Sequence, residues 1–221
     1  MFTDELFRTM EPKPVESGLL LDNLIVQSRK RMYQDGNVPC TELVIAGPAC
    51  TGKTRFAAYA AGMLRYHFVE GDLFHLHRVM ERARKESIPM TDEYRESEWI
   101  SAIAGGLLFA ALQHMEIVLT CSALKRSFRD MLVSLGSQIG MGDLWIVWMD
   151  VPADELRRRA EKRQRETNHP FGPEMIDSQL ADSEVPTDDE TRVIRVDGTL
   201  EPHMLLQEIV ERVPGLPAVG V

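Results

Sequence analysis

The segment GPACTGKT, residues Gly47–Thr54, constrains the fold of this chain more than any other feature. It fits the pattern G-x-x-x-x-G-K-[ST], in which a glycine-rich loop joins a buried strand to a helix. The apolar run Leu43–Ala46 comes directly before it, and a helical pattern begins at Lys53. Glycines let successive backbone N–H groups turn toward one anion, and the helix start adds its positive dipole end. The segment therefore predicts a phosphate-binding loop.

Two side chains of this loop carry most of its expected chemistry. Lys53 is placed to reach the β- and γ-phosphates of a nucleotide, and the Thr54 hydroxyl to contact a Mg²⁺ ion that bridges them. Cys50 has no evident chemical task in the loop. The predicted cofactors are ATP and Mg²⁺, with Thr54 as the metal-binding residue. The predicted nucleotide contacts in the loop are Gly47, Pro48, Ala49, Cys50, Thr51, Gly52, Lys53 and Thr54.

From residue 41 onward, short apolar runs alternate with helical patterns. Strand–helix–strand repetition requires crossover connections, so it predicts an α/β fold with a five-stranded, mostly parallel sheet covered by helices on both faces. Together with the phosphate-binding loop this is the P-loop NTPase fold, in which ligands bind beyond the carboxyl ends of the strands. The predicted strands are 43–46, 67–69, 117–121, 144–149 and 193–196, and the predicted helices are 53–66, 76–86, 96–113, 125–135, 153–164, 174–183 and 202–212.

The chain divides into three parts. Residues 1–40 are predicted to form an N-terminal extension, because Pro12 and Pro14 break its start and only one short amphipathic helix follows. Residues 41–213 form the predicted folded domain, and residues 214–221 a C-terminal tail. A length of 221 residues fits a single domain of this kind.

Composition excludes several classes of function. A net charge of -9 opposes binding of nucleic-acid backbones, and no apolar run reaches the roughly 18 residues of a membrane span. Asp4 and Glu5 stand where a secretory signal would carry cations. Three cysteines without metal-type spacing indicate reduced thiols in a cytoplasmic protein. We therefore expect small-molecule partners; the oligomeric state stays open, with a homodimer as one option.

The second predicted strand ends in EGDLFHLH, residues 70–77, on the same side of the sheet as the phosphate-binding loop. Phosphoryl transfer needs a group near the γ-phosphate that orients or deprotonates the attacking hydroxyl. Asp72 suits this catalytic role and would also contact the substrate, although it could instead only cap the following helix. His75 could bind a ligand hydroxyl or fill a helix turn.

Six segments of the chain resemble one kinase family. They are GPACTGKT at 47–54, EGDLFH at 70–75, IPMTDEYR at 88–95 followed by Trp99, CSALKRSFRDML at 121–132, DSQLADSEVP at 177–186, and the acidic stretch 188–190. Together they are similar to the gluconate kinases, small P-loop kinases related to the shikimate kinases. The resemblance covers about residues 41–213, and CSALKRSFRDML is its most diagnostic segment.

This resemblance implies roles for individual side chains on the substrate side. Asp72 would lie near the reacting hydroxyl and His75 near the sugar acid. Arg95 would bind the substrate carboxylate, for which a guanidinium fork is well matched. Arg95 could instead pair with Glu93 or Glu96 on a solvated face.

The segment after the third predicted strand adds weaker candidates. Lys125 could bind phosphate or the charge of the substrate, whereas Arg129, further along the same predicted helix, could equally lie at the surface. Cys121 is predicted to be a buried thiol, and Trp145 and Trp148 on the fourth strand are predicted to be core residues.

The run RRRAEKRQR, residues 157–165, is strongly basic within an acidic chain. Arg159 and Arg163 lie four residues apart on one face of a predicted helix. An irregular stretch with His169 follows, where related kinases carry a lid, so a mobile lid is predicted at about 163–173. Closure would bring arginine charge to the phosphoryl group and exclude water. We expect Arg159 to bind nucleotide, Arg163 to act in catalysis and His169 to contact substrate, while the outward cations form only a solvated face.

The sequence thus predicts an ATP-dependent kinase that converts D-gluconate to 6-phospho-D-gluconate. Glu70 stands where this family usually has Asp, and the stretch after His75 also departs from its pattern. A kinase of another sugar acid or a polyol is therefore an alternative. A nucleotide-binding regulatory protein without transfer activity is another, which the intact Lys53, Thr54 and Asp72 disfavour.

Overall fold

The computed structural model of the chain describes residues 41–75, 98–139, 142–167 and 172–219. These residues form a sheet of five parallel strands in the order β2-β3-β1-β4-β5. All five strands predicted from the sequence are confirmed. Their bounds are Thr41–Ala46 for β1, His67–Glu70 for β2, Ile117–Thr120 for β3, Asp143–Asp150 for β4 and Val193–Asp197 for β5.

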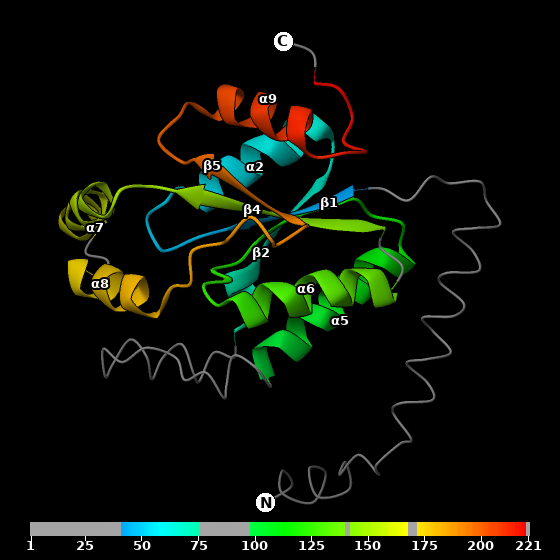
Figure 1. The fold of residues 1–221 in the computed structure, drawn as a ribbon, viewed down its shortest axis with the longest axis horizontal. Helices are drawn as coiled ribbons and strands as arrows, with labels where there is room; N and C mark the ends of the chain where they lie inside the picture. The colour runs from blue at the N-terminus through cyan, green and yellow to red at the C-terminus, as the bar shows by residue number, and fades with distance from the viewer. Residues whose placement is uncertain (1–40, 76–97, 140–141, 168–171, 220–221) are drawn as a thin grey trace, which may run out of the picture.

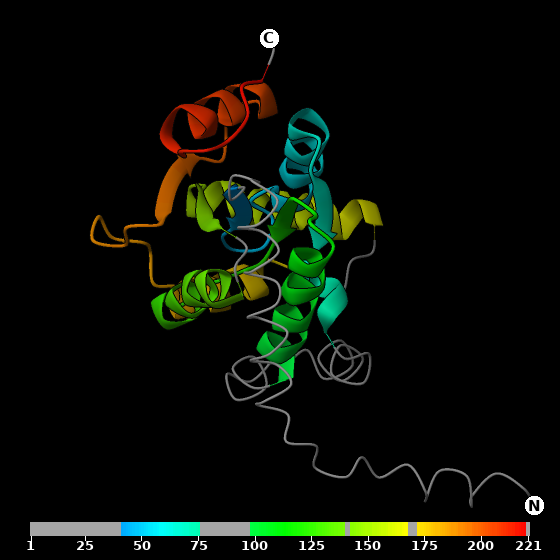
Figure 2. The same cartoon turned by 90° about the vertical axis from the view of Figure 1, so that its right-hand side faces the viewer.

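Helices cover both faces of this sheet. Successive side chains of the buried central strand β1 point to opposite faces. Leu43 and Ile45 pack with residues of α2 and α9, whereas Val44 and Ala46 pack with residues of α5 and α6. Figure 1 shows these two pairs of helices on opposite sides of the sheet, and Figure 2 shows the same arrangement after a quarter turn. The predicted α/β architecture is confirmed. The helices are α2 Lys53–Leu64, η1 Gly71–Phe74, α5 Ile100–Leu112, α6 Arg126–Ile139, α7 Ala153–Thr167, α8 Pro173–Asp182 and α9 Pro202–Arg212.

Every predicted helix that falls within the described residues is present. The helices α6 and α7 run past their predicted ends, to Ile139 and Thr167. The predicted helix at 76–86 lies outside the described residues, as does the predicted extension 1–40. Each of the described helices is too short or too polar to cross a lipid bilayer.

The predictions for individual core residues are mostly confirmed. Cys121 and Trp148 are buried, whereas Trp145 is only half-buried and lies beside Arg192, whose guanidinium carbon is 5.6 Å from the ring centroid. The option that Arg129 lies at the surface is wrong, because its side chain is fully buried. Its carboxylate partner lies 61 positions away in the chain, so no local pattern reveals it.

The part of the predicted tail that the structure describes packs on the domain. The Thr41 hydroxyl, at the start of β1, donates to the carbonyl oxygen of Pro214 at 2.7 Å. Leu216 and Val219 pack against the apolar cluster between the sheet and the helices α2 and α9. The described residues 214–219 therefore add to the packing near the start of β1.

Candidate active site

The phosphate-binding loop follows the central strand β1, which lies between β3 and β4. In a parallel sheet the carboxyl ends of all strands meet at one edge, where ligands bind. The Gly47 N–H donates to the carbonyl oxygen of Ser122, in the loop after β3, at 3.1 Å. The two loops that leave the middle of the sheet are thus fixed to each other at this edge.

Two glycines give the phosphate-binding loop its shape. Gly47 has φ 134° and Gly52 has φ 98°, in the region that favours glycine. A Cβ on Gly47 would also lie 3.1 Å from the carbonyl oxygen of Met149. Between the glycines, Thr51 is buried and its hydroxyl donates to the carbonyl oxygen of Pro48 at 3.0 Å. The loop predicted from the sequence is therefore built around two backbone positions that require glycine.

Lys53 lies across this loop. Its ammonium donates to the carbonyl oxygens of Gly47 at 2.8 Å and Pro48 at 2.7 Å. Desolvation lowers the pKa of Lys53, and the negative charges of Asp72 and Glu70 oppose that shift. The predicted phosphate-binding lysine and the predicted catalytic carboxylate are thus brought close enough to interact.

The end of β2 positions these carboxylates through a close backbone contact. Gly71 lies so near β3 that a Cβ there would be 2.0 Å from the carbonyl oxygen of Thr120. The Thr120 hydroxyl donates to the Glu70 carboxylate and accepts from the Gly71 N–H at 3.2 Å. The next side chain, Asp72, is 75% exposed, so it is open to a substrate. The Glu70 carboxylate thus contacts Thr120, whereas the Asp72 carboxylate is exposed to solvent.

His75 sits behind Asp72 on an aromatic stack. Its side chain is only 8% exposed, and its Nε2 lies 3.8 Å from the Asp72 carboxylate. The His75 ring stacks on Trp99 with 4.7 Å between centroids, and Trp99 stacks on Phe128 at 5.1 Å. The Trp99 indole N–H donates to the carbonyl oxygen of Gly71 at 3.2 Å. The stack therefore supports the loop that carries Asp72.

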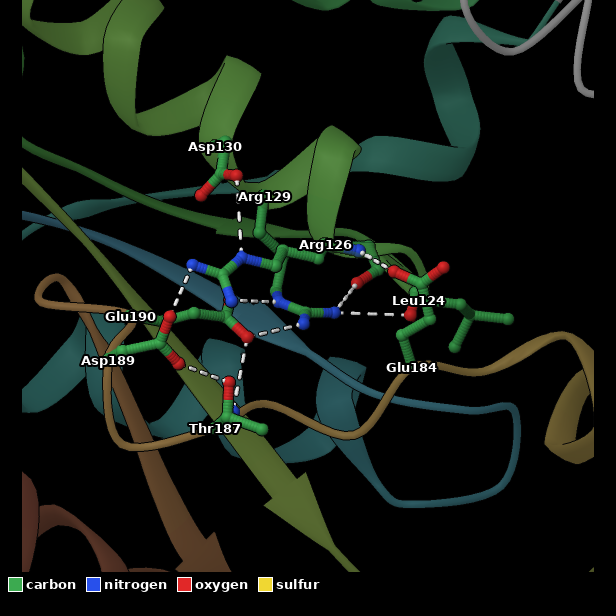
Figure 3. A network of polar contacts seen from close by, with 9 residues as sticks. Leu124, Arg126, Arg129, Asp130, Glu184, Thr187, Asp189 and Glu190 are labelled. Atoms are coloured by element: carbon green, nitrogen blue, oxygen red, sulfur yellow. Dashed lines mark hydrogen bonds and ion pairs between the residues drawn. The ribbon is translucent and has the colours of Figure 1, made fainter.

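A buried ion pair holds the loop that follows β3 (Figure 3). The Arg129 guanidinium donates to both carboxylate oxygens of Glu190 at 2.7 Å, and to the carbonyl oxygens of Ala123 and Leu124 at 3.1 Å. The hydrogen bonds from Arg129 lower the pKa of Glu190, which favours its ionised form. Removing one partner would leave a buried charge uncompensated, which typically costs about 3–5 kcal/mol. This pair thus anchors the loop beside the phosphate-binding loop.

The two predicted lid arginines differ in position. Arg159 is partly buried, and its guanidinium donates to the carbonyl oxygens of Cys50 at 3.4 Å and Thr51 at 3.2 Å. It also donates to Glu155 at 2.7 Å; hydrogen bonds from Arg158 and Arg159 lower the pKa of Glu155 to about 2. Arg163 is exposed, and within the described ranges no ion pair joins it to another residue. The structure brings Arg159 to the phosphate-binding loop and leaves Arg163 one helical turn away.

The outward cations of α7 pair with carboxylates. Arg158 pairs with Glu155 at 2.7 Å and is 66% exposed, and Lys162 pairs with Glu166 at 3.9 Å. For these residues the expected solvated face is present. Arg157 also bonds Asp177 of α8 at 2.8 Å, so it joins the two helices.

The remaining predicted substrate contacts are spread between described and undescribed segments. Lys125, directly before α6, has its ammonium 3.5 Å from the carboxylate of Asp182 of α8. Arg95 and His169 lie outside the described residues. The roles predicted for all three stay predictions.

Sequence reasoning missed two residues of this site. Glu70 appeared only as a departure from a family pattern, although its place before the Gly71–Asp72 pair could have marked it as a second carboxylate. Gln179 of α8 accepts the Ala49 N–H at 2.6 Å. No local signal announces that contact, because it joins positions 130 residues apart.

Comparison with known proteins supports one family over most of the chain. A family model described as an AAA domain matches residues 43–186. The gluconokinase of Gluconobacter oxydans (strain 621H) is 38% identical over 170 residues, which cover 76% of this chain and 88% of that relative. The chain belongs to the gluconokinase family. The probable gluconokinase of Schizosaccharomyces pombe is 35% identical over 156 residues, covering 69% of this chain and 77% of the relative.

Solved structures agree with membership of the gluconokinase family. A gluconokinase from Sinorhizobium meliloti 1021 matches with a TM-score of 0.63 and 29% identity, over 78% of this chain and 90% of that one. A sugar kinase from Janibacter sp. HTCC2649 matches with a TM-score of 0.64 and 27% identity, over 78% and 94%. The predicted P-loop NTPase fold is confirmed by these neighbours.

Proposed function

We propose that this protein transfers the γ-phosphate of ATP to D-gluconate, giving ADP and 6-phospho-D-gluconate. The observation that carries the proposal is the position of Lys53 across a phosphate-binding loop, at the same edge of the sheet as the exposed Asp72. Kinase chemistry needs both groups there, one for phosphate charge and one for the attacking hydroxyl. Membership of the gluconokinase family supports gluconate as the acceptor.

The proposed transfer uses groups of this chain in defined roles. A gluconate hydroxyl attacks the γ-phosphorus and forms a new O–P bond. The bond from the γ-phosphorus to the β–γ bridging oxygen breaks, and its electron pair leaves with ADP. Exposed Asp72 accepts the hydroxyl proton, and Lys53 offsets the negative charge on the β- and γ-phosphates.

The site also suits Mg²⁺ bound together with ATP. Thr54 is exposed in the first turn of α2, and the carboxylates of Glu70 and Asp72 interact with neighbouring Lys53. Such oxygen atoms are the ligands that Mg²⁺ prefers, and the ion would neutralise phosphate charge. Among the described residues, no group of three His, Cys, Asp or Glu side chains could hold a metal alone. We propose Thr54 and the phosphates as its ligands.

The proposal also includes the remaining substrate contacts, the role of Arg163, the location of the protein and its assembly. We propose that the substrate contacts, besides Asp72, are His75, Arg95, Lys125 and His169. Arg163 would approach the transferred phosphoryl group from the lid. Cys50 and Cys121 are free thiols, which supports a cytoplasmic location. A homodimer is proposed as the assembly, and light scattering of the purified protein tests it.

One assay separates the proposed function from its alternatives. ADP release is measured with ATP, Mg²⁺ and a panel of aldonic acids and polyols, each at several concentrations. We expect gluconate to give the highest kcat/KM. A higher value with another acid or polyol would reassign the substrate. Nucleotide binding in calorimetry without turnover on any acceptor would favour a regulatory role.

A further inference from the structure

Two helices that follow β4 hold the phosphate-binding loop from outside. The amide oxygen of Gln179, on α8, accepts the Ala49 N–H at 2.6 Å. The guanidinium of Arg159, on α7, donates to the carbonyl oxygens of Cys50 and Thr51. Figure 1 shows α7 and α8 side by side beyond the carboxyl end of β4. Three consecutive loop residues are thus bonded by side chains that lie more than 100 positions later, at separations of 130, 109 and 108.

A small apolar cluster lies beneath the same residues. It consists of Leu156 and Ala160 from α7 and Ile176 from α8, all buried. Ala49 and Cys50 of the loop pack against it. The polar contacts from Gln179 and Arg159 are therefore made from helices that already rest on the loop, which limits the side-chain entropy lost in forming them.

The contacts from Arg159 set the direction of two loop amides. A peptide group is planar and trans, so its C=O and N–H point to opposite sides. Holding the carbonyl oxygens of Cys50 and Thr51 on the α7 side turns the N–H groups of Thr51 and Gly52 the other way. Amides of a glycine-rich loop turned in this manner are the donors that bind phosphate oxygens.

The contact from Gln179 holds an earlier peptide of the loop, the one that joins Pro48 to Ala49. The carbonyl oxygen of this peptide accepts from the Lys53 ammonium at 2.7 Å, and its N–H donates to Gln179. The next residue, Cys50, has φ 64° although it is not glycine. Such a conformation is sparsely populated and persists only where the surroundings hold it. Gln179 supplies one of these contacts on the N-terminal side of Cys50.

We propose that Gln179 is a positioning residue of the nucleotide site. By holding the Ala49 N–H, it keeps the phosphate-binding loop in its binding shape before ATP arrives, while Arg159 holds the C-terminal side. A neutral amide suits this position, because a carboxylate there would repel the triphosphate. The proposal rests on the proposed kinase function only for its kinetic test, since loop shape and nucleotide affinity are measured without an acceptor.

The test uses the full chain with Gln179→Ala, and Gln207→Ala as the matched control. Gln207 lies on α9, where its exposed amide bonds only Glu211 at 3.2 Å among the described residues. The measurements are the Kd of ADP by calorimetry, KM for ATP and for gluconate, and exchange of the Ala49 amide by NMR. We expect the Kd of ADP and the KM for ATP to rise about three- to tenfold, as for loss of one hydrogen bond. The gluconate KM should stay within twofold, and the Ala49 amide should exchange faster.

A second variant, Gln179→Glu, separates the hydrogen bond from the bulk of the side chain. It retains an acceptor for the Ala49 N–H, so amide exchange should match the parent, while its charge should weaken nucleotide binding. It also keeps the test open if Gln179→Ala lowers the melting temperature more than the control does. An ADP Kd within twofold of the parent in Gln179→Ala, or unchanged Ala49 exchange in that variant, would overturn the proposal. Absent gluconate turnover in the parent would count against the proposed function instead.

Discussion

The carboxyl ends and the amino ends of the parallel strands form two edges of the sheet, and the charged side chains at these two edges differ in burial and in role. At the carboxyl edge, the ammonium of Lys53 lies among backbone carbonyls, with exposed Asp72 near enough to influence its pKa. At the amino edge, Glu42 is buried on β1 and accepts the Ile117 N–H at 2.5 Å. Desolvation, together with the charge of Glu116, raises the pKa of Glu42 to about 8, although the Ile117 N–H lowers it.

The contrast shows how one sheet separates function from stability. At the carboxyl edge, the Lys53 ammonium lies across the phosphate-binding loop and the Asp72 carboxylate is exposed, so both groups are placed to meet a ligand. The carboxyl group of Glu42 stays protonated at neutral pH, because desolvation raises its pKa to about 8. At this amino edge, the Thr41 hydroxyl also donates a hydrogen bond to the carbonyl oxygen of Pro214. Substitutions at the carboxyl edge should therefore change the rate of phosphoryl transfer, and substitutions at the amino edge should change the free energy of unfolding.

The largest expected effect is that of Lys53→Ala. Loss of the ammonium removes charge stabilisation in the transition state, so kcat with gluconate should fall by about 10²–10³-fold or more. The melting temperature should not fall, because desolvation already disfavours the charged form of Lys53. Coupled ADP-release assays and thermal melts measure the two effects. The exposed Lys162→Ala serves as the control, and a Lys53→Ala rate near that of the control would contradict the assignment.

The second-largest fall in kcat is expected for Asp72→Asn. The amide keeps the shape of the side chain but cannot accept the hydroxyl proton, so kcat should fall by about 10²-fold or more. The Kd of ADP should change little, since the exposed Asp72 carboxylate is assigned to the attacking hydroxyl and not to the nucleotide. Single-turnover kinetics with calorimetry separates the two quantities. An unchanged kcat would return Asp72 to the helix-capping role.

At the amino edge, Glu42→Gln should change the pH dependence of stability instead. The unfolded carboxyl titrates near 4.5 and the folded one near 8, so between these values the folded state binds more protons. Stability of the parent should therefore be complete below about pH 4.5 for this group and fall as pH rises toward 8, by on the order of 4 kcal/mol. Urea unfolding at pH 5 and pH 8 measures the slope. Glu42→Gln should flatten it without altering kcat, and equal slopes in both proteins would contradict the buried neutral carboxyl.

At both edges, features set by a few neighbouring residues could be predicted from the sequence, whereas contacts between distant segments could not. The phosphate-binding loop and the five strands were predictable because glycine spacing and apolar runs act over a few residues. The place of Asp72 at the carboxyl edge was predictable because it follows the carboxyl end of a parallel strand, β2, and the loop follows the carboxyl end of β1. The partner of Arg129 and the contact of Gln179 were not, since each joins elements far apart in the chain. Glu42 was equally hidden, because a single carboxylate in an apolar strand has no local signature of burial.

The smallest expected effect at the carboxyl edge distinguishes two neighbouring arginines of α7. Arg159 is 29% exposed and contacts the loop carbonyls, whereas Arg158 is 66% exposed and contacts Glu155 in the preceding turn. Arg159→Ala should lower kcat/KM for ATP by about tenfold, as for a charged hydrogen bond. Arg158→Ala should stay within about twofold, because an exposed ion pair contributes little and acts on stability alone. Raising the salt concentration should weaken the Arg158 pair first and leave the ratio of the two variants unchanged. Equal losses in both variants would mean that α7 acts through its summed positive charge, and the position of Arg159 beside the loop would then carry no separate role.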